Sequence, residues 1–304
     1  MLLHVTNETG RLKSVVLGQP KSMGKNPTLE QTYDAKSRES VLKKIYPTEE
    51  AISKEMTGFD DVLKKYDVHV FRPWVIPNCN QVFARDVGFV IDDKIIISNI
   101  FPDREDEQEA YDFIFKSAAF NKIFNLPESA HIEGGDVVLY NDFLFVGTYK
   151  GGDYGKYKTA RTNSHGVNFL RELFPHKKVL DFSLVKNDEN PHKGVLHLDC
   201  AFQPIGNNKA IIYKEGFRGL EDYETVLEIF GKDNIFHVTE EEMYHMTPNI
   251  FSISPNIVVT EQNFTRLNNF LEKEWGFIVE KIPYNEISKM GGLLRCSTLP
   301  LFRE

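Results

Sequence analysis

The residues with the most chemical potential are a cysteine near the C-terminus, a histidine in the middle of the chain and several acids. Cys296 lies in the run GGLLRCSTLP, and His197 stands two residues before Asp199 in HLD. Further upstream are EGGD, which begins at Glu133, and FARD, which ends at Asp86. A thiolate is a soft nucleophile, imidazole moves protons at neutral pH, and fixed carboxylates bind cations. Together these groups suit attack on an electrophile that is itself a cation.

A guanidinium group fits this set, because it is planar, has forked N–H donors and stays charged at physiological pH. We expect Asp86 and Asp199 to grip its edges while Cys296 attacks its central carbon. A free thiol has a pKa of about 8.5, so activation requires a cation, either the guanidinium or protonated His197. His197 would protonate the departing amine and later take a proton from water, and Glu133 behind it would fix its tautomer.

Paired apolar runs joined by polar turns predict β-hairpins along the chain. Asn and Asp at the turns support this reading, since they tolerate the left-handed conformations that tight hairpins need. The predicted hairpins cover 87–98, 137–147, 201–213 and 250–260. Apolar residues spaced by three and four then predict helices over 110–120, 167–174, 223–230 and 264–275. A closing strand follows each helix, at 123–126, 178–182, 234–238 and 277–282.

The N-terminal part offers a fifth copy, with strands at 12–17 and 68–71 and a helix over 51–63. Such ββαβ units leave apolar faces that only a neighbouring unit can cover, so we predict one domain, 1–304, whose five units surround an axis. An α+β mixture without symmetry is the alternative. Every polar motif opens the first strand of a unit, which would bring all of them to one mouth of the central channel.

The segment 18–48 stands outside this rhythm and is polar, with three prolines and many charges. It reads equally well as a lid over the site or as a structural excursion. Arg85 adjoins Asp86 but should point the opposite way on an extended chain, so we expect it to form a structural ion pair. Cys79 and Cys200 are predicted to be packing residues.

The bulk composition limits the partners. The chain has 304 residues, a net charge of −8 and three cysteines, with no block of lysine and arginine. We therefore expect no nucleic acid. The N-terminus lacks a signal-peptide pattern, no apolar run reaches membrane-spanning length, and the odd cysteine count favours a reducing compartment. A cytoplasmic protein with a small cationic substrate and no membrane partner is expected, and a homo-oligomer is left open. Metal or cofactor binding is not expected, because cysteine and histidine lack ligand spacing.

The motifs FARD, HIEGGD, ARTN, HLDCAF and GGLLRCSTLP resemble those of the guanidine-modifying enzymes: arginine deiminase, dimethylarginine dimethylaminohydrolase and the glycine amidinotransferases. The likeness runs from Gly10 to the C-terminus. It implies the five-bladed α/β propeller, or pentein fold, in agreement with the five units above. It also implies that Cys296 is the nucleophile, His197 the general acid and base, and Glu133 the partner of His197.

The same resemblance suggests how a substrate would be held. Asp86 and Asp199 become the guanidinium clamp, and Phe83 packs beside the substrate. Arg161, in ARTN, corresponds to the arginine that holds the α-carboxylate, and Arg104 is a second candidate for that task. For Asp136 two roles are open, a contact with the substrate or a cap on the Gly-Gly turn.

Several functions remain open at this stage. The simplest is hydrolysis of arginine to citrulline and ammonia, in the manner of arginine deiminase, or a dimethylargininase-like reaction. Enzymes acting on methylated arginine usually carry lysine where this chain has Asp199, which favours an unsubstituted guanidinium. The stretch before Asp199 and the surroundings of Asn249 resemble amidinotransferases, which pass the amidino group to an amine. A non-catalytic pentein binding protein is the alternative of another class. A cysteine protease is disfavoured, because a peptide carbonyl needs donors for its oxyanion.

Overall fold

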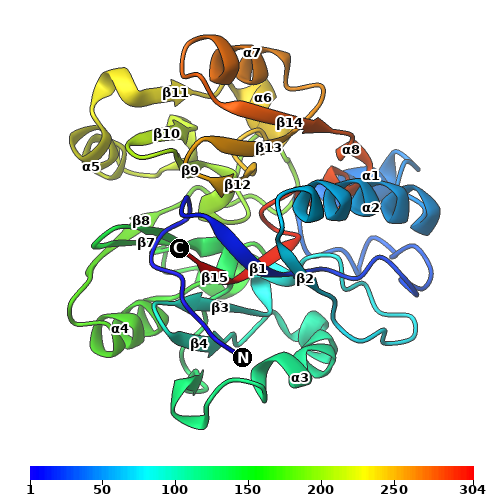
Figure 1. Cartoon of the computed structure of the whole chain (residues 1–304). Coiled ribbons are helices and arrows are strands. Elements are labelled where there is room, and N and C mark those ends of the chain that lie inside the picture. The colour runs from blue at the N-terminus through cyan, green and yellow to red at the C-terminus, as the bar shows by residue number, and fades with distance from the viewer.

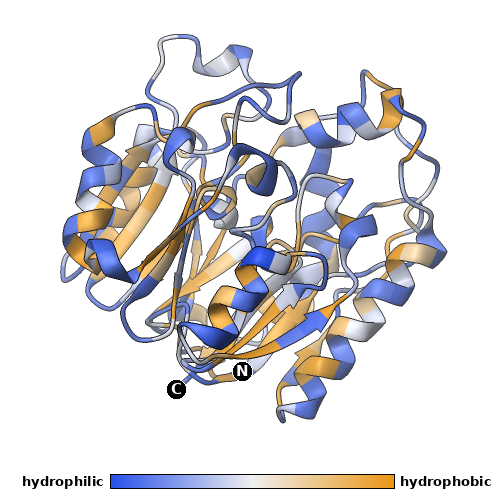
Figure 2. Cartoon of the chain, turned by 90° about the horizontal axis from the view of Figure 1, so that it is seen from above, coloured by the Kyte–Doolittle hydropathy of each residue, from blue (hydrophilic) through white to orange (hydrophobic).

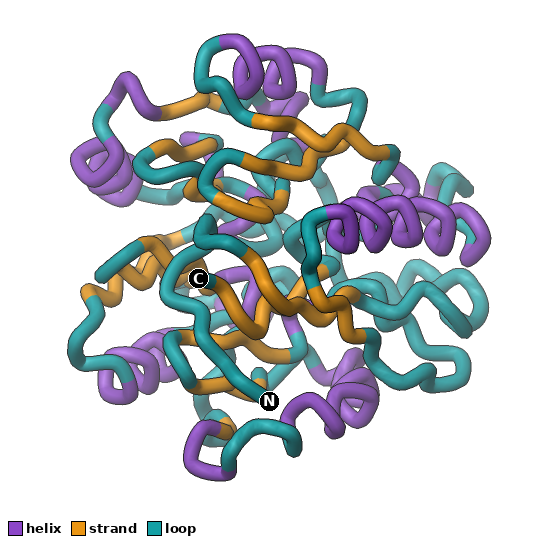
Figure 3. Tube along the Cα trace, in the orientation of Figure 1, coloured by secondary structure: helices purple, strands orange, loops and turns teal.

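Five small sheets of three strands each surround a common centre (Figure 1). The computed structural model describes all 304 residues. Helices lie mainly outside the sheets, and loops connect the elements (Figure 3). This arrangement confirms the predicted five-bladed α/β propeller.

Four sheets are built alike, and each begins with one of the predicted hairpins. The second strand of the hairpin lies in the middle, antiparallel to the first strand and parallel to a third. The strands are β3 (Gly88–Ile91), β4 (Lys94–Ile97) and β5 (Ile123–Asn125); β6 (Val137–Tyr140), β7 (Phe143–Thr148) and β8 (Lys178–Ser183); β9 (Phe202–Ile205), β10 (Lys209–Ile212) and β11 (Ile235–His237); and β12 (Phe251–Ser254), β13 (Ile257–Glu261) and β14 (Ile278–Ile282).

The remaining sheet joins the two ends of the chain. Strand β1 (Leu12–Leu17) pairs in parallel with β2 (His69–Phe71) and antiparallel with β15 (Thr298–Arg303). No strand was predicted for the last residues. This closure brings Cys296, two residues before β15, to the position that the other polar motifs hold in their sheets.

The helices cover the apolar faces of the sheets. They are α1 (Ala35–Leu42), α2 (Glu49–Lys65), α3 (Asp112–Phe115), α4 (Ser164–Leu173), α5 (Leu220–Phe230), α6 (Glu240–Tyr244), α7 (Thr265–Lys273) and α8 (Asn285–Ser288). Figure 2 shows apolar strands inside and helices with one polar and one apolar side. In α4, for example, Val167 and Leu170 are buried, as expected of an amphipathic surface helix. No helix combines the length and the apolar character needed to cross a bilayer.

The helix predicted over 110–120 was largely wrong. The stretch Pro102–Tyr111 is a 3₁₀-helix, only Asp112–Phe115 is α-helical, and Phe120 is 94% exposed. A 3₁₀-helix has three residues per turn, so Arg104 and Glu107 eclipse each other and both turn inward. Arg104 and Glu107 also form a buried ion pair across this turn, a feature that apolar periodicity does not reveal.

Short 3₁₀ turns precede the first strand of three neighbouring sheets, at Ala84–Asp86, Gly134–Asp136 and Leu198–Cys200. They pack against one another near the centre of the ring. A Cβ atom on Gly134 would lie 2.1 Å from the Arg85 carbonyl oxygen. One on Gly135 would lie 2.5 Å from Nδ1 of His197. The two glycines of EGGD are therefore required by the close approach of the turns.

Candidate active site

The nine residues singled out from the sequence are all buried, with exposures of 6% or less. They are Phe83, Asp86, Arg104, Glu133, Asp136, Arg161, His197, Asp199 and Cys296. They come from the loops and turns that precede first strands, or from the connections that cover these turns. The convergence expected from the repeat is therefore present, although individual side chains have partners that the sequence did not predict.

His197 lies between two carboxylates. Its Nε2 is 2.9 Å from Oε2 of Glu133, which confirms the predicted pairing. On the other side, Nδ1 is 3.7 Å from Oδ1 of Asp86, and neither atom has a hydrogen-bond partner. Glu133 also accepts a hydrogen bond from the backbone N–H of Phe101 at 2.9 Å. Both of its carboxylate oxygens accept from a terminal nitrogen of Arg161, each at 3.0 Å.

These acids control the charge of the imidazole. Burial disfavours its protonated form, but Asp86, Asp136 and Glu133 outweigh burial and raise the pKa of His197 to about 9. In the opposite direction, Arg161 and His197 overcome the burial of Glu133 and hold the pKa of its carboxyl well below the ordinary value. At neutral pH the pair is therefore an imidazolium beside a carboxylate.

Cys296 has a different environment. The side-chain amide of Asn249 donates a hydrogen bond to its Sγ at 3.1 Å and accepts one from its backbone N–H at 3.1 Å. The sulfur is also 3.7 Å from Oδ2 of Asp199. Burial and the charge of Asp199 raise the pKa of the Cys296 thiol well above its usual range. Without a ligand the sulfur is therefore protonated at neutral pH.

Both clamp candidates are fixed by a buried arginine. Oδ2 of Asp86 accepts from Arg104 at 2.7 Å, and Oδ2 of Asp199 accepts from Arg295 at 2.8 Å. Arg295 also pairs with Glu8 at 2.8 Å. No role was predicted for Arg295 or Glu8. The place of Arg295 directly before Cys296 was the only available signal.

Asp136 holds neighbouring turns together. One carboxylate oxygen accepts from the backbone N–H of Leu198 at 2.9 Å, and the other accepts from the hydroxyl of Thr162 at 2.7 Å. Both oxygens thus have protein donors, which fits a structural role for Asp136, and the substrate contact considered for it stays a prediction. Phe83 is buried and its ring packs against the loop before Cys296, since a Cβ atom on Gly292 would lie 2.5 Å from the ring.

The two arginines expected to hold a carboxylate are already paired. Arg161 donates to Glu133, to the Tyr33 carbonyl at 2.8 Å and to the Lys158 carbonyl, and its guanidinium lies 4.5 Å above the Phe101 ring. Arg104 pairs with Glu107 through two bonds, of 2.7 and 2.9 Å, in addition to Asp86.

Arg85 forms no ion pair, contrary to expectation. Its guanidinium donates to the Arg295 carbonyl at 3.3 Å and to the hydroxyl of Thr298 at 3.1 Å. Its backbone N–H donates to the Cys296 carbonyl at 3.0 Å. The 3₁₀ turn, in place of an extended strand, directs Arg85 into the seam between the first two sheets, where carbonyl and hydroxyl oxygens are its acceptors.

The segment 18–48 covers this site. Lys158 donates to the carbonyl of Thr32 at 3.0 Å, Arg161 to that of Tyr33, and Ser40 to that of Lys289 at 2.8 Å. Because the segment lies over the site, its position supports a role as a lid over a purely structural role. That the segment opens stays a prediction. Cys200 is buried as expected, and its sulfur lies 3.6 Å from Oδ1 of Asp199.

A metal ion has potential ligands in one place. One atom each of Asp86, Glu133 and His197 lies within 4.8 Å of the others, a grouping that sequence spacing did not reveal. However, Arg161 contacts both oxygens of Glu133. A resident cation beside the same carboxylate would be repelled by this guanidinium, so we interpret the group as a proton-handling network.

The propeller and its central set of motifs, together with the family match given next, define the chain as a pentein, within the superfamily of guanidine-modifying enzymes. The model of the family described as N,N dimethylarginine dimethylhydrolase, eukaryotic, matches residues 19–303. The chain therefore belongs to the dimethylarginine dimethylhydrolase family.

Individual relatives are more distant. The uncharacterized protein YkgA of Bacillus subtilis (strain 168) is 26% identical over 298 residues, or 97% of this chain and 94% of YkgA. An arginine deiminase of Treponema denticola is 23% identical over 273 residues, or 75% of this chain. The chain matches only 62% of that longer enzyme.

Solved structures agree on the fold. The N-terminal domain of ArgZ, an arginine dihydrolase of cyanobacteria, has been seen covalently bound to a reaction intermediate. It superposes with a TM-score of 0.78 at 17% identity, over 95% of this chain and 98% of that one. The inosamine-phosphate amidinotransferase of Streptomyces griseus has a TM-score of 0.77 at 15% identity, over 99% of this chain and 97% of its own.

Proposed function

We propose that this protein hydrolyses a C–N bond of an arginine-like guanidino or ureido compound through a covalent intermediate on Cys296. The observation that carries the proposal is the pairing of a buried thiol with Asp199 at 3.7 Å, next to a site where His197 faces Asp86. A nucleophile surrounded by acids is suited to a cationic electrophile, and poorly suited to a developing oxyanion.

The first half of the reaction uses the substrate's own charge. The guanidinium lies between Asp86 and Asp199 and offsets the carboxylate charge that keeps the thiol protonated. Cys296 then releases its proton to solvent as the substrate enters, and Sγ attacks the central carbon. The C–N bond breaks as His197, an imidazolium at neutral pH, gives its proton to the departing amine or ammonia. The product of this half is a thiouronium on Cys296.

The second half reverses the role of the imidazole. Neutral His197 takes a proton from water, and the resulting hydroxide attacks the thiouronium carbon. The C–S bond breaks, the sulfur leaves with the electron pair and takes up the proton of the added hydroxyl group, and a neutral ureido product departs with Cys296 again a thiol. For arginine the products are citrulline and ammonia. Glu133, 2.9 Å from Nε2, stabilises the imidazolium in both halves.

Acid quench during turnover is the decisive experiment. The intact protein is incubated with arginine, methylarginines, agmatine or guanidinoacetate, denatured in acid, digested and examined by mass spectrometry. We expect a thiouronium adduct on the peptide containing Cys296, with the mass of the substrate less the departing ammonia or amine, and neither adduct nor product with Cys296→Ala. Product formation that persists in Cys296→Ala would refute the mechanism.

Amidino transfer is the second candidate, and the depth of the site favours it. His197 is 0% exposed and Cys296 is 2% exposed, so bulk water has no direct access to the sulfur. A transferase must exclude water until an amine accepts the amidino group. Product that forms only when an amine such as glycine is added would select transfer over hydrolysis. Recovery of bound but unaltered guanidine, without adduct, would select the non-catalytic binding protein.

Location and assembly remain proposals. Three free cysteines fit a reducing compartment such as the cytoplasm. A single folding unit over 1–304 is supported by the pairing of β1 with β15, which ties the ends of the chain together. Sedimentation of the purified protein would determine whether it forms a homo-oligomer.

A further inference from the structure

We propose that Glu8 and Glu107 are positioning residues that prepare the two clamp aspartates for a guanidinium. Each acid holds one edge of a buried arginine, so that the arginine takes one oxygen of the aspartate and leaves the other to the substrate. This inference rests on the proposed function and adds two residues to its binding machinery. It follows from an arrangement that the chain builds twice, at Asp86 and at Asp199.

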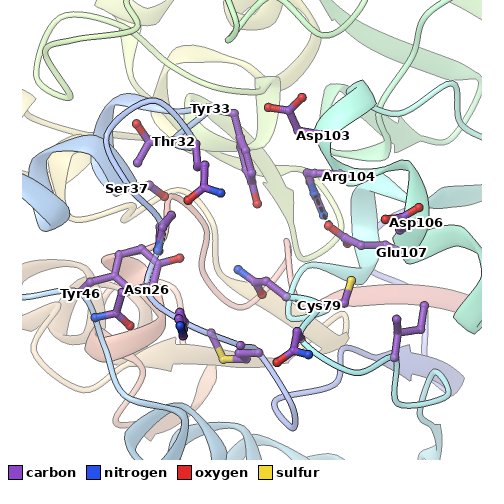
Figure 4. A pocket seen from close by; sticks show the side chains of 18 of the residues that line it. Asn26, Thr32, Tyr33, Ser37, Tyr46, Cys79, Asp103, Arg104, Asp106 and Glu107 are labelled. Carbon is purple, nitrogen blue, oxygen red and sulfur yellow. Dashed lines mark hydrogen bonds and ion pairs between the residues drawn. The ribbon is translucent and has the colours of Figure 1, made fainter.

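The first triad consists of Asp86, Arg104 and Glu107. Nη1 of Arg104 donates to Oδ2 of Asp86 at 2.7 Å. Its Nε and Nη2 form a fork on the two carboxylate oxygens of Glu107, at 2.7 and 2.9 Å, and Nη2 also donates to the Phe83 carbonyl at 3.2 Å. Figure 4 shows Arg104 and Glu107 together at the wall of a cavity of about 310 Å³. Oδ1 of Asp86 is left without a hydrogen-bond partner.

The second triad, Asp199, Arg295 and Glu8, repeats this geometry. Nη1 of Arg295 donates to Oδ2 of Asp199 at 2.8 Å. Its Nε and Nη2 form a fork on Glu8, at 3.2 and 2.8 Å, and Nη2 also donates to the Val137 carbonyl at 2.7 Å. Oδ1 of Asp199 has no N–H or O–H donor and meets only two thiol sulfurs, at 3.6 and 4.0 Å. In both triads the aspartate therefore keeps one oxygen open.

The likeness of the two triads does not come from the repeat of the fold. Glu107 follows Arg104 by three residues within one 3₁₀-helix, whereas Glu8 lies 287 residues before Arg295. Arg104 comes after the second strand of its sheet, whereas Arg295 comes directly before Cys296. Unrelated segments thus supply the same contacts, which indicates that the site, and not the fold, requires them.

Charge pairing alone does not explain the second acid of each triad. One carboxylate would neutralise each buried arginine, and a further buried negative charge is costly unless a cation accompanies it. With both carboxylates ionised, each triad carries one negative charge in excess. A guanidinium between Asp86 and Asp199, with the imidazolium of His197 beside Asp86, would balance these charges.

The two outer acids differ in how firmly they are ionised. Burial opposes the charge of Glu8, but Arg295 and two further arginines outweigh burial and lower the pKa of its carboxyl to about 2. At Glu107, burial outweighs the charge of Arg104 and raises the pKa of the carboxyl. Removal of the charge at Glu8 is therefore expected to have the larger effect.

Steady-state kinetics test the inference, with whichever guanidine of the acid-quench experiment gives product. In Glu8→Gln, Arg295 is free to offer its fork to both oxygens of Asp199 and to cancel its charge. KM should rise about 5- to 20-fold while kcat stays within about threefold, as when ground state and transition state lose the same binding. Glu107→Gln should raise KM about 3- to 10-fold for the same reason.

Aspartate variants separate charge from packing. Glu8→Asp and Glu107→Asp keep the charge and leave a gap, whereas the glutamine variants keep the volume and lose the charge. A positioning role predicts a smaller rise in KM for Asp than for Gln, and a packing role predicts the reverse. Glu261→Gln is the matched control and should leave KM unchanged, because Glu261 is also 3% exposed but bonds Asn263 and no arginine.

Alkylation by iodoacetamide, read on the peptide that contains Cys296, needs no turnover. Apart from burial, three titratable neighbours raise the pKa of this thiol: Asp199, Cys200 and Asp86. In Glu8→Gln, Arg295 would neutralise Asp199 more fully, so alkylation at pH 8 should speed up about 3- to 10-fold and its pH profile should move to lower pH. Adding Glu8→Gln to Asp199→Asn should give no further increase, because Glu8 acts through Asp199.

The outcomes separate this inference from the proposed function. Unchanged KM in both glutamine variants, a larger rise for Asp than for Gln, or an unchanged alkylation profile in Glu8→Gln would overturn the inference alone. If one glutamine variant does not fold, the other triad and the aspartate variants carry the test. Absence of product from every guanidine with the unaltered protein would refute the proposed function, and the alkylation profile would then decide whether Glu8 acts on the thiol.

Discussion

The imidazole side and the thiol side of the site differ in how their charges are balanced. His197 is surrounded by Glu133, Asp86 and Asp136, and these acids hold it protonated against the effect of burial. Cys296 is buried beside Asp199, and burial and this carboxylate hold its thiol protonated as well, although the Asn249 amide donates a hydrogen bond to its sulfur. The same type of neighbour therefore creates a charge on one side and prevents a charge on the other.

This difference indicates what the resting site lacks. An imidazolium is already present to act as an acid, whereas the nucleophile is still a neutral thiol. A guanidinium placed between Asp86 and Asp199 would cancel the charges that raise the pKa of Cys296. Binding and activation would then be one event, and the sulfur would stay unreactive towards other electrophiles until a cation arrives.

The largest effect is expected on the imidazole side. In Glu133→Gln, His197 loses its principal hydrogen-bonded charge and its pKa falls from about 9 towards 6.5. Since general acid–base catalysis contributes about 10²–10⁴-fold, kcat should fall by that order. In the pH profile of kcat, the alkaline decrease should also begin at a lower pH in the variant than in the unaltered protein.

Steady-state kinetics between pH 6 and 10 would measure both changes. Glu128→Gln, at an exposed position, is the control for a lost acid and should behave like the unaltered protein. A decrease in kcat of less than about threefold would contradict the assignment of Glu133, because general acid–base catalysis would then be nearly intact.

On the thiol side, Asp199→Asn should have effects of opposite sign on two measurements. Asp199 raises the pKa of Cys296, so its removal lowers that pKa and speeds alkylation by iodoacetamide at neutral pH. At the same time the guanidinium loses a charge-assisted bond of roughly 1.5–3 kcal/mol, so kcat/KM should fall about 10- to 100-fold. Slower alkylation, or a parallel change in both measurements, would be inconsistent with the proposed coupling.

Asp86→Asn sharpens this comparison. Asp86 has a smaller influence on the thiol than Asp199 has. The variant should therefore lose kcat/KM without a comparable rise in the rate of alkylation. The melting temperature of each variant would show that Arg104 and Arg295 still pack inside the protein after losing a carboxylate.

Local sequence signals were sufficient for most strands. Hairpins such as Val137–Tyr140 with Phe143–Thr148 were predicted because apolar runs and Asn-Asp turns are encoded within a few residues. The closing pair of β1 with β15 was missed, because it depends on contact between the two ends of the chain. The convergence of the motifs could nevertheless be predicted from the repeat.

The charge pairing inside the site could not be predicted in the same way. The motifs identified His197 and Glu133, and their contact was expected from chemistry. The pairs Arg161–Glu133 and Arg104–Glu107 depend on how connections fold over the turns, which apolar periodicity does not encode. Arg161 and Arg104, which the resemblance assigned to a substrate carboxylate, therefore have partners within the chain that the sequence did not reveal.

A smaller effect is expected from the amide that contacts the sulfur. Asn249→Ala removes the donor at 3.1 Å from Sγ and the acceptor for the backbone N–H of Cys296. One such hydrogen bond contributes about 1 kcal/mol, so adduct formation in rapid-quench experiments should slow about 5- to 10-fold. Asn249→Asp should be slower still, because a second carboxylate at the sulfur raises its pKa further. Equal rates in the two variants would contradict an electrostatic role for this position.

The last test of the comparison concerns stability, because the charge of the imidazole makes the free energy of unfolding depend on pH. The pKa of His197 is about 9 in the folded protein, against an ordinary value of 6.5. A raised pKa favours folding below 6.5, and this contribution is lost as the pH rises through 9. The melting temperature of the protein should therefore exceed that of His197→Gln most at pH 6, and the difference should shrink by pH 9.5. Each kcal/mol of change in the free energy of unfolding shifts the melting temperature by on the order of 2–4 °C. His165→Gln, at an exposed histidine, is the control. A difference that stays constant across this range would mean that His197 is neutral in the folded state, and the contrast between a charged imidazole and a neutral thiol would be lost.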